Sequence, residues 1–354
     1  MATIGDPTEL LARNAAHLQC RHLLVVDPPR ADCIANLRGT AAADRVTALV
    51  RDFRLLRALS EHPDSERHPI FDLVLPSAVA CDRAVVYLPK GKRALAMTLA
   101  MLAAKLPASI SVLVVGALRD GIKSAGEPMS RYLDHVTKLD SARHCAVYRG
   151  HTRASGHCEF DLSSWEQVYD YTDGARTLRL AQYPGVFSDG HLDDGTAHLL
   201  RHMELNDPGR LLDMGCGCGI IGATAAVKWS DCRVDLVDSA AAALWATNRT
   251  LAINRLERAR CFASDLFSEV SEKYDVIVTN PPFHEANRTD SETSLALIRG
   301  AAQHLHSGGS LQLVANRFLP YRDTLAGVFT EVKILFEDGR YRVYKAQTPR
   351  QAGT

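Results

Sequence analysis

Short apolar runs rich in β-branched residues alternate along the chain with longer stretches rich in alanine and leucine. In the second half these runs predict five strands, at Arg210–Asp213, Val234–Asp238, Ala259–Ala263, Tyr274–Thr279 and Ser310–Ala315. Helical stretches separate them, which is the pattern of a parallel sheet with helices packed on its faces. The sequence therefore predicts an α/β fold, in which ligands bind at the carboxyl ends of the strands.

The end of the chain departs from this alternation. Two further strands, Val332–Phe336 and Tyr341–Ala346, flank the turn Glu337-Asp338-Gly339-Arg340 and predict a hairpin. Five crossovers followed by a hairpin are the outline of a class I methyltransferase, whereas a dinucleotide dehydrogenase normally continues with parallel strand–helix units. A nicotinamide-dependent dehydrogenase is therefore the least favoured interpretation, and the chain has no obvious histidine–acid pair for hydride transfer.

The first half resembles a degenerate copy of the second. The strand within Asp82–Pro89, the helix after it and the strand Ser111–Val115 repeat the order found over Asp275–Val314. Leu23–Asp27 stands where the second half has its glycine-rich strand end, but Pro28-Pro29 follows it, so no main-chain amides are free to approach a ligand. We predict two tandem Rossmann-like class I methyltransferase domains, the first degenerate. The alternative is the general likeness of any two Rossmann-like sheets.

Length and charge are consistent with two domains. Residues 1–150 form the predicted first domain, 151–182 a polar linker with little periodicity, and 183–354 the second domain. Lys plus Arg and Asp plus Glu number 41 each in the 354 residues, which excludes a uniformly basic nucleic-acid clamp. The first 150 residues nevertheless carry 20 basic and 15 acidic side chains, so this half is favoured to hold a polyanion.

The cysteines and the apolar runs indicate the cellular compartment in which the protein is expected. Nine scattered cysteines without a C-x-x-C spacing indicate neither a disulfide framework nor a zinc ribbon. Cys216 and Cys218 are expected to pack rather than to bind a metal. Met1–Leu10 has no apolar signal region, and the longest apolar run, Val112–Leu118, is too short to span a bilayer. We therefore expect a cytoplasmic protein without metal or membrane partner.

The strongest local signal is Leu211-Leu212-Asp213-Met214-Gly215-Cys216-Gly217-Cys218-Gly219. Gly215, Gly217 and Gly219 let the chain turn sharply and let a ligand lie against main-chain N–H groups at a helix start, which suits a dinucleotide equally well. Asp213 precedes them, where an anion suits a cationic ligand end and opposes a pyrophosphate. Asp238 ends the next strand, where it can bind ribose hydroxyls. An amino-acid-bearing nucleoside such as S-adenosylmethionine satisfies both acids.

A second motif, Thr279-Asn280-Pro281-Pro282-Phe283-His284, follows the fourth strand at the same edge. The lone pair of an exocyclic amine is delocalised into its ring, so the nitrogen must be drawn toward tetrahedral geometry before it attacks a methyl group. The side-chain carbonyl of Asn280 and the main-chain carbonyl of Pro281 can each accept one amine hydrogen and align the lone pair. Pro282 stiffens this arrangement, and Phe283 can stack on a base swung out of its helix. Because asparagine is a weak base, we expect the proton to leave to solvent after transfer.

Two weaker candidates accompany these motifs. Asp265 lies two residues past the third strand, where it can bind an adenine amino group, although acids are common at strand ends. Pro184-Gly185-Val186-Phe187-Ser188 precedes a predicted helix start at Leu192–Thr196. Phe187 is a candidate lid over the cofactor, and a plain connecting segment is the alternative.

With these motifs and several others, the chain closely resembles the bacterial 16S ribosomal RNA (guanine-N2)-methyltransferases of the methyltransferase small-domain family, over nearly its full length. The other motifs are Tyr87–Lys90, Lys138–Arg143, Leu297–Ala301, Leu311–Asn316, Phe318–Tyr321 and Tyr341–Tyr344. The resemblance implies an active second domain, S-adenosylmethionine as methyl donor, and the N2 amine of a guanine in 16S rRNA of the small ribosomal subunit as target.

The resemblance also implies roles for single residues. It places the cofactor loop on Asp213, Gly215, Gly217 and Gly219, the ribose acid on Asp238, the adenine-side acid on Asp265, and the catalytic motif on Asn280, Pro281, Pro282 and Phe283. Many members have a basic residue directly after the Phe-Ser of the candidate lid, where this chain has Asp189. This departure weakens an RNA-contact role for that segment but not the fold.

The net positive first half suits RNA, because phosphate contacts position RNA without reading its sequence. Lys90, Lys92 and Arg93 are the leading candidates, with Arg119 and Lys123, and solvated surface charge is the alternative for each. Two joined domains favour a monomer.

Three alternative functions stay open. One is a 23S rRNA guanine-N2 methyltransferase, since those enzymes share the Asn-Pro-Pro-Phe motif. Another is a protein-glutamine methyltransferase, although that group favours tyrosine after the prolines. The third is a cofactor-binding ribosome-assembly factor with a relic site. The intact glycine loop and Asn280 argue against a relic, because a relic should have decayed as the first half has.

Overall fold

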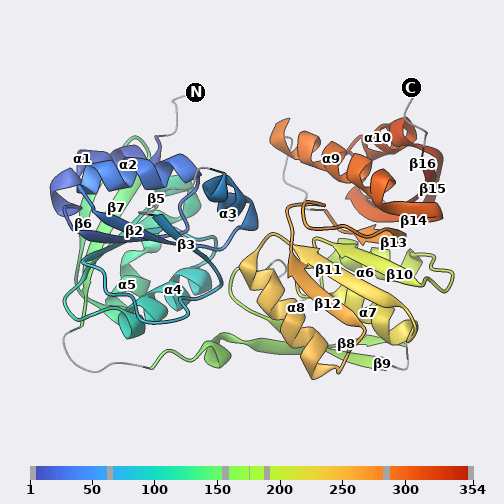
Figure 1. The fold of residues 1–354 in the computed structure, drawn as a ribbon, viewed down its shortest axis with the longest axis horizontal. Helices are drawn as coiled ribbons and strands as arrows, with labels where there is room; N and C mark the ends of the chain where they lie inside the picture. Colours follow the sequence, from blue (N-terminus) through green and yellow to red (C-terminus); the bar gives the residue numbers. More distant parts are fainter. Residues whose placement is uncertain are drawn as a thin grey trace. The chain divides into compact units, whose positions relative to one another are not determined.

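The computed structural model describes residues 5–61, 67–153, 159–174, 176–186, 192–281 and 288–349. The chain divides into two units, Met1–Glu166 and Gln167–Thr354, each with a sheet of its own (Figure 1). The division falls inside the segment predicted as a linker. No helix among the described residues is long and apolar enough to cross a membrane.

A seven-stranded sheet in the order β3-β2-β1-β4-β5-β7-β6 forms the centre of the first unit. Strands β1 to β5 run parallel to one another, and β7 is antiparallel to both β5 and β6. The strands are β1 (His22–Val26), β2 (Arg45–Val50), β3 (Arg67–Phe71), β4 (Arg83–Tyr87), β5 (Ser111–Ala117), β6 (Leu133–Ala142) and β7 (Cys145–Thr152).

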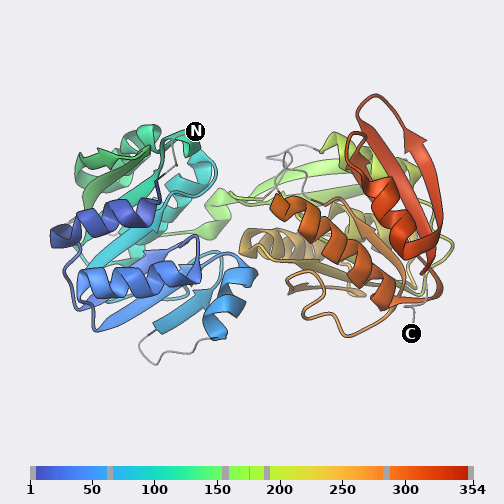
Figure 2. The same ribbon diagram turned by 90° about the horizontal axis from the view of Figure 1, so that it is seen from above.

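Helices cover both faces of this sheet, with α1 and α2 on one face and α4 and α5 on the other (Figures 1 and 2). The helices are α1 (Pro7–Arg13), α2 (Ala31–Ala41), α3 (Phe53–Ser60), α4 (Lys92–Lys105) and α5 (Gly126–Tyr132). Short 3₁₀ turns are η1 (Ala15–His17), η2 (Leu118–Asp120), η3 (Ile122–Ser124) and η4 (Leu162–Trp165).

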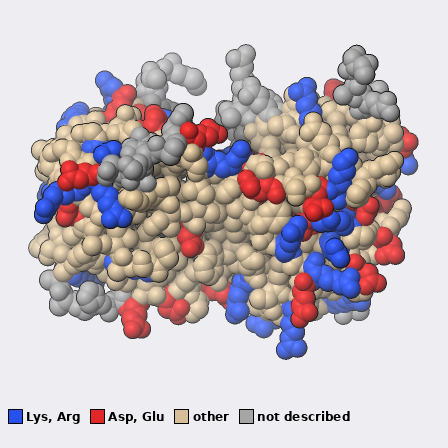
Figure 3. All heavy atoms as spheres, viewed as in Figure 1, with Lys and Arg blue, Asp and Glu red and all other residues tan. Residues whose placement is uncertain are grey.

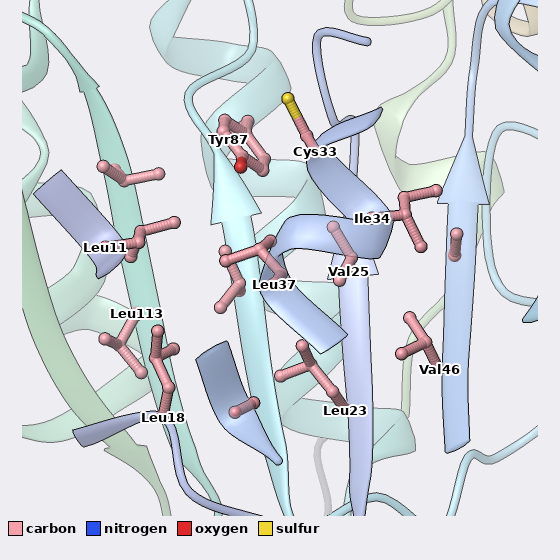
Figure 4. Packing of buried hydrophobic residues seen from close by; sticks show 14 of the residues in the cluster. Leu11, Leu18, Leu23, Val25, Cys33, Ile34, Leu37, Val46, Tyr87 and Leu113 are labelled. Atoms are coloured by element: carbon pink, nitrogen blue, oxygen red, sulfur yellow. The ribbon is translucent and has the colours of Figure 1, made fainter. Parts of the chain in front are cut away.

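The core of the first unit follows from the helical spacing of apolar residues in α2. Cys33, Ile34, Leu37 and Ala41 recur on one side of the helix and are buried there. They pack with residues of α1 and of the central strands, such as Leu23 of β1 (Figure 4). Fully burying an aliphatic side chain of this kind contributes about 1.5–3 kcal/mol, so this face holds the helix on the sheet.

The second unit repeats the strand order of the first, as β12-β11-β10-β13-β14-β16-β15. Its strands are β10 (Arg210–Met214), β11 (Arg233–Asp238), β12 (Ala259–Ala263), β13 (Tyr274–Thr279), β14 (Leu305–Asn316), β15 (Phe329–Glu337) and β16 (Tyr341–Pro349). Its helices are α6 (Asp194–His202), α7 (Ile220–Lys228), α8 (Ala241–Ile253), α9 (Arg288–His304) and α10 (Tyr321–Val328). Two sheets of identical order confirm the predicted tandem fold, including the closing hairpin.

One part of the predicted linker is ordered structure of the second unit. Two of its stretches form an antiparallel pair, β8 (Gln167–Asp173) and β9 (Arg176–Gln182). The pair is anchored on α8, because the Ala181 N–H donates to Thr250 Oγ1 at 3.0 Å and the Arg179 N–H donates to Asn254 Oδ1 at 3.0 Å. The alternation of buried Leu178 and Leu180 could have predicted β9. Arg176 and Arg179 made the segment look like a polar linker instead.

Candidate active site

The sequence-predicted acids, glycines and asparagine meet at one edge of the second sheet. Strands β12, β11, β10 and β13 are successive parallel neighbours, so their carboxyl ends lie side by side. Asp265 follows β12, Asp238 ends β11, Gly215 follows β10 and Asn280 follows β13. The topology therefore brings together residues that are far apart in the chain.

The glycine-rich turn after β10 is hydrogen-bonded to β11 and has open space beside two of its glycines. The Gly215 and Cys216 N–H groups donate to the Val237 carbonyl at 2.8 and 3.0 Å, which pins the turn to β11. Gly215 and Gly217 have φ of +72° and +58°, and a Cβ added to either would meet nothing within 4 Å. Positive φ explains why glycine suits these positions. The open space beside both residues gives a ligand access to the turn. The N–H groups of Gly215, Gly217 and Gly219 donate inside the protein, however, so the expectation that they face a ligand is wrong for this structure.

Asp213 lies under this turn rather than on its surface. Its side chain is fully buried, and its Oδ2 accepts a hydrogen bond from the Gly222 N–H at 2.8 Å. Gly222 must be glycine, since a Cβ there would lie 2.4 Å from Leu236 Cδ2. Asp213 Oδ1 is buried and has no hydrogen-bond partner among the described residues. Burial and the nearby charge of Asp238 raise the pKa of Asp213 to about 7, against the lowering effect of the Gly222 hydrogen bond.

The other two acids stand further along the same edge. Asp238 braces the glycine turn, because its Oδ2 accepts from the Gly217 N–H at 3.0 Å and its Oδ1 accepts from the Ala240 N–H at 2.9 Å. Asp265 is half-buried, and its N–H donates to Ser268 Oγ at 3.1 Å in a local turn.

Asn280 is fixed by two contacts from the start of α6. Its Nδ2 donates to Asp193 Oδ2 at 2.9 Å and to Thr196 Oγ1 at 2.7 Å. Its Oδ1 is buried and has no hydrogen-bond partner among the described residues. An amide carbonyl at the carboxyl edge of the sheet is thus free to accept a hydrogen bond, which is the chemistry that the motif predicted.

Sequence reasoning missed the contribution of Asp193 and Thr196. The run Leu192–Thr196 predicted a helix start, and Asp193 caps α6 by accepting the Thr196 N–H at 2.9 Å. Nothing in the sequence linked this cap to an asparagine 87 residues away. Phe187, Pro282 and Phe283 lie outside the described residues, and Pro281 is described and buried.

The two cysteines of the glycine turn pack, as expected, against hydroxyl groups. Cys216 Sγ lies 3.3 Å from Thr247 Oγ1, and Cys218 Sγ lies 3.5 Å from Tyr169 Oη on β8. Both are buried free thiols, and burial raises their pKa. Within the ranges that the structure describes, no group of three or more His, Cys, Asp or Glu is placed to hold a metal ion.

The predicted RNA-binding residues lie at the corresponding edge of the first sheet. Lys90 and Lys92 are exposed between β4 and the start of α4, and Arg119 and Lys123 are exposed after β5. Arg93 is half-buried, and its guanidinium donates to the Trp165 carbonyl at 3.1 Å, so part of it is used inside the unit. On the face seen in Figure 3, basic and acidic side chains are interspersed over both units.

Both halves of the chain match known sequence families. Residues 177–345 match the model described as methyltransferase small domain, and residues 8–169 match the model described as methyltransferase small domain N-terminal. The chain is 40% identical over 355 residues to the ribosomal RNA small subunit methyltransferase C of Salmonella typhimurium, covering 99% of both chains. It is 35% identical over 346 residues to the protein of that name from Hahella chejuensis, covering 98% of this chain and 99% of the relative.

The chain belongs to the ribosomal RNA small subunit methyltransferase C family. A solved structure of a T. thermophilus 16S rRNA N2 methyltransferase, in complex with AdoMet and guanosine, has the same fold. It matches with a TM-score of 0.81 at 22% identity, covering 97% of this chain and 92% of that chain. Membership confirms the resemblance inferred from the motifs, and the shared fold confirms the tandem architecture of the family in this chain.

Proposed function

We propose that the protein methylates the exocyclic N2 amine of a guanine in 16S ribosomal RNA, with S-adenosylmethionine as donor. Family membership supports the reaction class. The observation that carries the proposal is the buried Asn280 Oδ1, which has no hydrogen-bond partner among the described residues and stands at the strand end beside the glycine turn. It is an acceptor placed for an amine that arrives at this edge.

The residues at the edge fit S-adenosylmethionine. Open space over Gly215 and Gly217 admits a nucleoside against the backbone, and the buried Asp213 Oδ1 is an acceptor for an ammonium group. Asp238 binds the ribose hydroxyls and Asp265 the adenine amino group in this proposal. When bound, S-adenosylmethionine supplies a methyl group activated by its sulfonium.

The protein's own task is to orient the amine. Asn280 Oδ1 accepts one N2 hydrogen and the Pro281 carbonyl accepts the other, so that the nitrogen lone pair points away from the ring plane toward the methyl carbon. With the donor bound, the nitrogen would gain a bond to the methyl carbon as the bond between that carbon and the sulfonium sulfur breaks, which leaves a neutral thioether, and the nitrogen would then lose one proton to solvent. Phe283 stacks on the guanine, which must leave its helix to reach the site.

The first unit positions the RNA in this proposal. Lys90, Lys92, Arg119 and Lys123 are exposed at one sheet edge and contact phosphates, with Arg93 as a partial contributor. The glycine turn, its acids and Asn280 all come from the second unit, and we propose that the enzyme works as a monomer. We place it in the cytoplasm, where ribosomal subunits assemble.

Methyl transfer to ribosomal subunits tests the proposal. Tritiated S-adenosylmethionine is incubated with 30S and, separately, 50S subunits from undermethylated cells, and the RNA is digested to nucleosides. We expect label as N2-methylguanosine in 16S rRNA, and its loss with Asn280→Ala. Label in 23S rRNA would show that the protein is a 23S rRNA methyltransferase instead and would contradict the proposal. Tight cofactor binding without any RNA label contradicts the proposal and points to a protein substrate or an assembly role.

A further inference from the structure

Both hydrogens of the Asn280 amide are used inside the protein. One is donated to Asp193 Oδ2 at 2.9 Å and the other to Thr196 Oγ1 at 2.7 Å. The Thr196 hydroxyl lies 3.4 Å from the same Asp193 oxygen and donates its own hydrogen there. Its lone pairs therefore face the amide, and both partners of Asn280 act as acceptors.

This arrangement decides which end of the amide meets the substrate. The oxygen and nitrogen of an asparagine side chain have nearly the same shape, so only their hydrogen-bond partners distinguish the two orientations. A turned amide would set its oxygen against a carboxylate and a hydroxyl oxygen. It would also point its N–H groups at the target amine, which is a hydrogen-bond donor, so the amine would have no acceptor.

We propose that Asp193 and Thr196 are positioning residues that hold the Asn280 amide with its oxygen toward the target amine. The inference rests on the proposed function and adds to it two residues that do not contact the reacting atoms. Asp193 also polarises the amide, because a hydrogen bond from Nδ2 to a charged acceptor increases the negative charge on Oδ1. Oδ1 thereby becomes a better acceptor for the amine hydrogen.

The first turn of α6 is built to place this carboxylate. Asp193 folds back over the helix start to cap the Thr196 N–H at 2.9 Å. Gly195 allows this, since a Cβ there would lie 3.0 Å from Asp193 Oδ2 and 3.2 Å from the Tyr341 ring. The same oxygen that caps the helix thus also accepts from Asn280, the residue after β13. Capping alone does not require the second contact, so the two roles can be separated by substitution.

Substitutions at Thr196 separate positioning from helix stability. Thr196→Val keeps the shape and the capped N–H but removes the acceptor, and we expect kcat to fall roughly 10- to 100-fold with KM values within about twofold. Thr196→Ser, which restores a hydroxyl, recovers most of the rate. Asp193→Ser keeps a good cap residue but is too short to reach Asn280, so it lowers kcat in the same way. Thr324→Val, in the first turn of α10, is the matched control and leaves the rate unchanged.

A double substitution makes the inference falsifiable. If Thr196 acts through Asn280, Thr196→Val adds no further loss in the Asn280→Ala background, because the coupled group is gone. Additive losses, or an unchanged kcat in Thr196→Val, overturn the inference while leaving the proposed function intact. Absence of methyl transfer by the unsubstituted protein overturns the proposed function instead.

A spectroscopic readout does not depend on activity. In protein labelled with ¹⁵N at asparagine side chains, the Asn280 amide pair is identified by its loss in Asn280→Ala. We expect two resolved proton signals protected from exchange, and in Thr196→Val a large shift and faster exchange of one of them. An unchanged pair of signals in Thr196→Val contradicts the proposed contacts.

Discussion

Arg51 and Asp27 form an ion pair, with 2.6 Å between Nη1 and Oδ2, at the carboxyl edge of the first sheet. Asp27 follows β1 at the position of Gly215, and Arg51 follows β2 one residue past the position of Asp238. Arg51 Nε also donates to the Leu73 carbonyl at 2.8 Å, which ties in the segment after β3. By strand register Val50 has the position of Asp238, so the first unit has no acid there, and Pro28 and Pro29 have the positions of Cys216 and Gly217.

The first prediction is that each chain binds one molecule of S-adenosylmethionine. The ion pair and the prolines deny the first unit both an open backbone and a ribose acceptor, so only the second unit binds. Isothermal titration calorimetry measures the stoichiometry. Asp238→Ala should abolish the single site or weaken it strongly, and Arg51→Ala should not create another. Two bound molecules per chain would contradict the structural account of the degenerate unit.

The second prediction concerns the stability of the first unit. Arg51 and Asp27 have side chains only 14% and 20% exposed, whereas the Arg54–Asp52 pair is 60% and 40% exposed. Removing Arg51 leaves the largely buried Asp27 carboxylate without its partner, so Arg51→Ala should lower the free energy of unfolding by about 1–3 kcal/mol. Arg54→Ala is the matched control, with a loss below about 1 kcal/mol. Equal losses in urea unfolding would show that burial does not distinguish the pairs.

The sheet was predictable because its strands carry a dense local signal. β12 and β13 begin and end at the predicted residues, Ala259–Ala263 and Tyr274–Thr279, since polar or turn-forming residues bound each run. The position of the candidate site followed from the strand order, which places the ends of β10, β11, β12 and β13 together. Local patterns and one topological rule were enough to place Asp213, Asp238, Asp265 and Asn280 near this edge, and their roles stay predictions.

The remaining features depend on contacts between distant segments. The β8–β9 pair packs on α8 through Thr250 and Asn254, and its charged residues concealed the alternation. The bond from Asn280 to Asp193 spans 87 residues, and no short motif encodes it. Arg93 was predicted to lie at an RNA surface. Its contact with Trp165 could not be predicted, because Trp165 lies in a segment that has little periodicity.

The third prediction tests the basic edge of the first unit. Charge reversal at Lys90 and Lys92 should weaken RNA binding roughly tenfold or more and flatten its salt dependence, because two phosphate contacts are lost. S-adenosylmethionine affinity should not change, since the glycine turn is in the other unit. Adding Arg93→Glu to the pair should also reduce stability, because the bond to Trp165 is lost.

The control for this experiment is Lys138→Glu, an equally exposed lysine on the edge strand β6. Filter binding of the RNA at several salt concentrations gives affinity and slope for each variant. An RNA affinity that does not change in the Lys90 and Lys92 variant would remove this edge from the binding surface.

The fourth prediction is a pH dependence that originates at Asp213. The pKa of this carboxyl is about 7 in the folded chain and 3.8 in its ordinary environment. Its neighbours are Asp238 and the thiols of Cys216 and Cys218, whose raised pKa values keep the thiols neutral near pH 7. The folded chain therefore holds this proton more tightly than the unfolded chain. Its contribution to stability is complete below about pH 4 and is lost as the pH rises to about 7.

Asp213→Asn separates this effect from all others, because an amide oxygen can still accept the Gly222 N–H. Without cofactor, the variant should be more stable than the unsubstituted protein at about pH 8 and lose that advantage toward pH 4. Cofactor binding should instead favour the ionised form of Asp213, since an ammonium group pairs with an ionised carboxylate. We expect S-adenosylmethionine affinity to rise between about pH 6 and 7.5, with proton release, while the ligand amine stays charged. Calorimetry in buffers of different ionisation enthalpy measures that release, and a variant that keeps the same pH profile would exclude Asp213 as its origin.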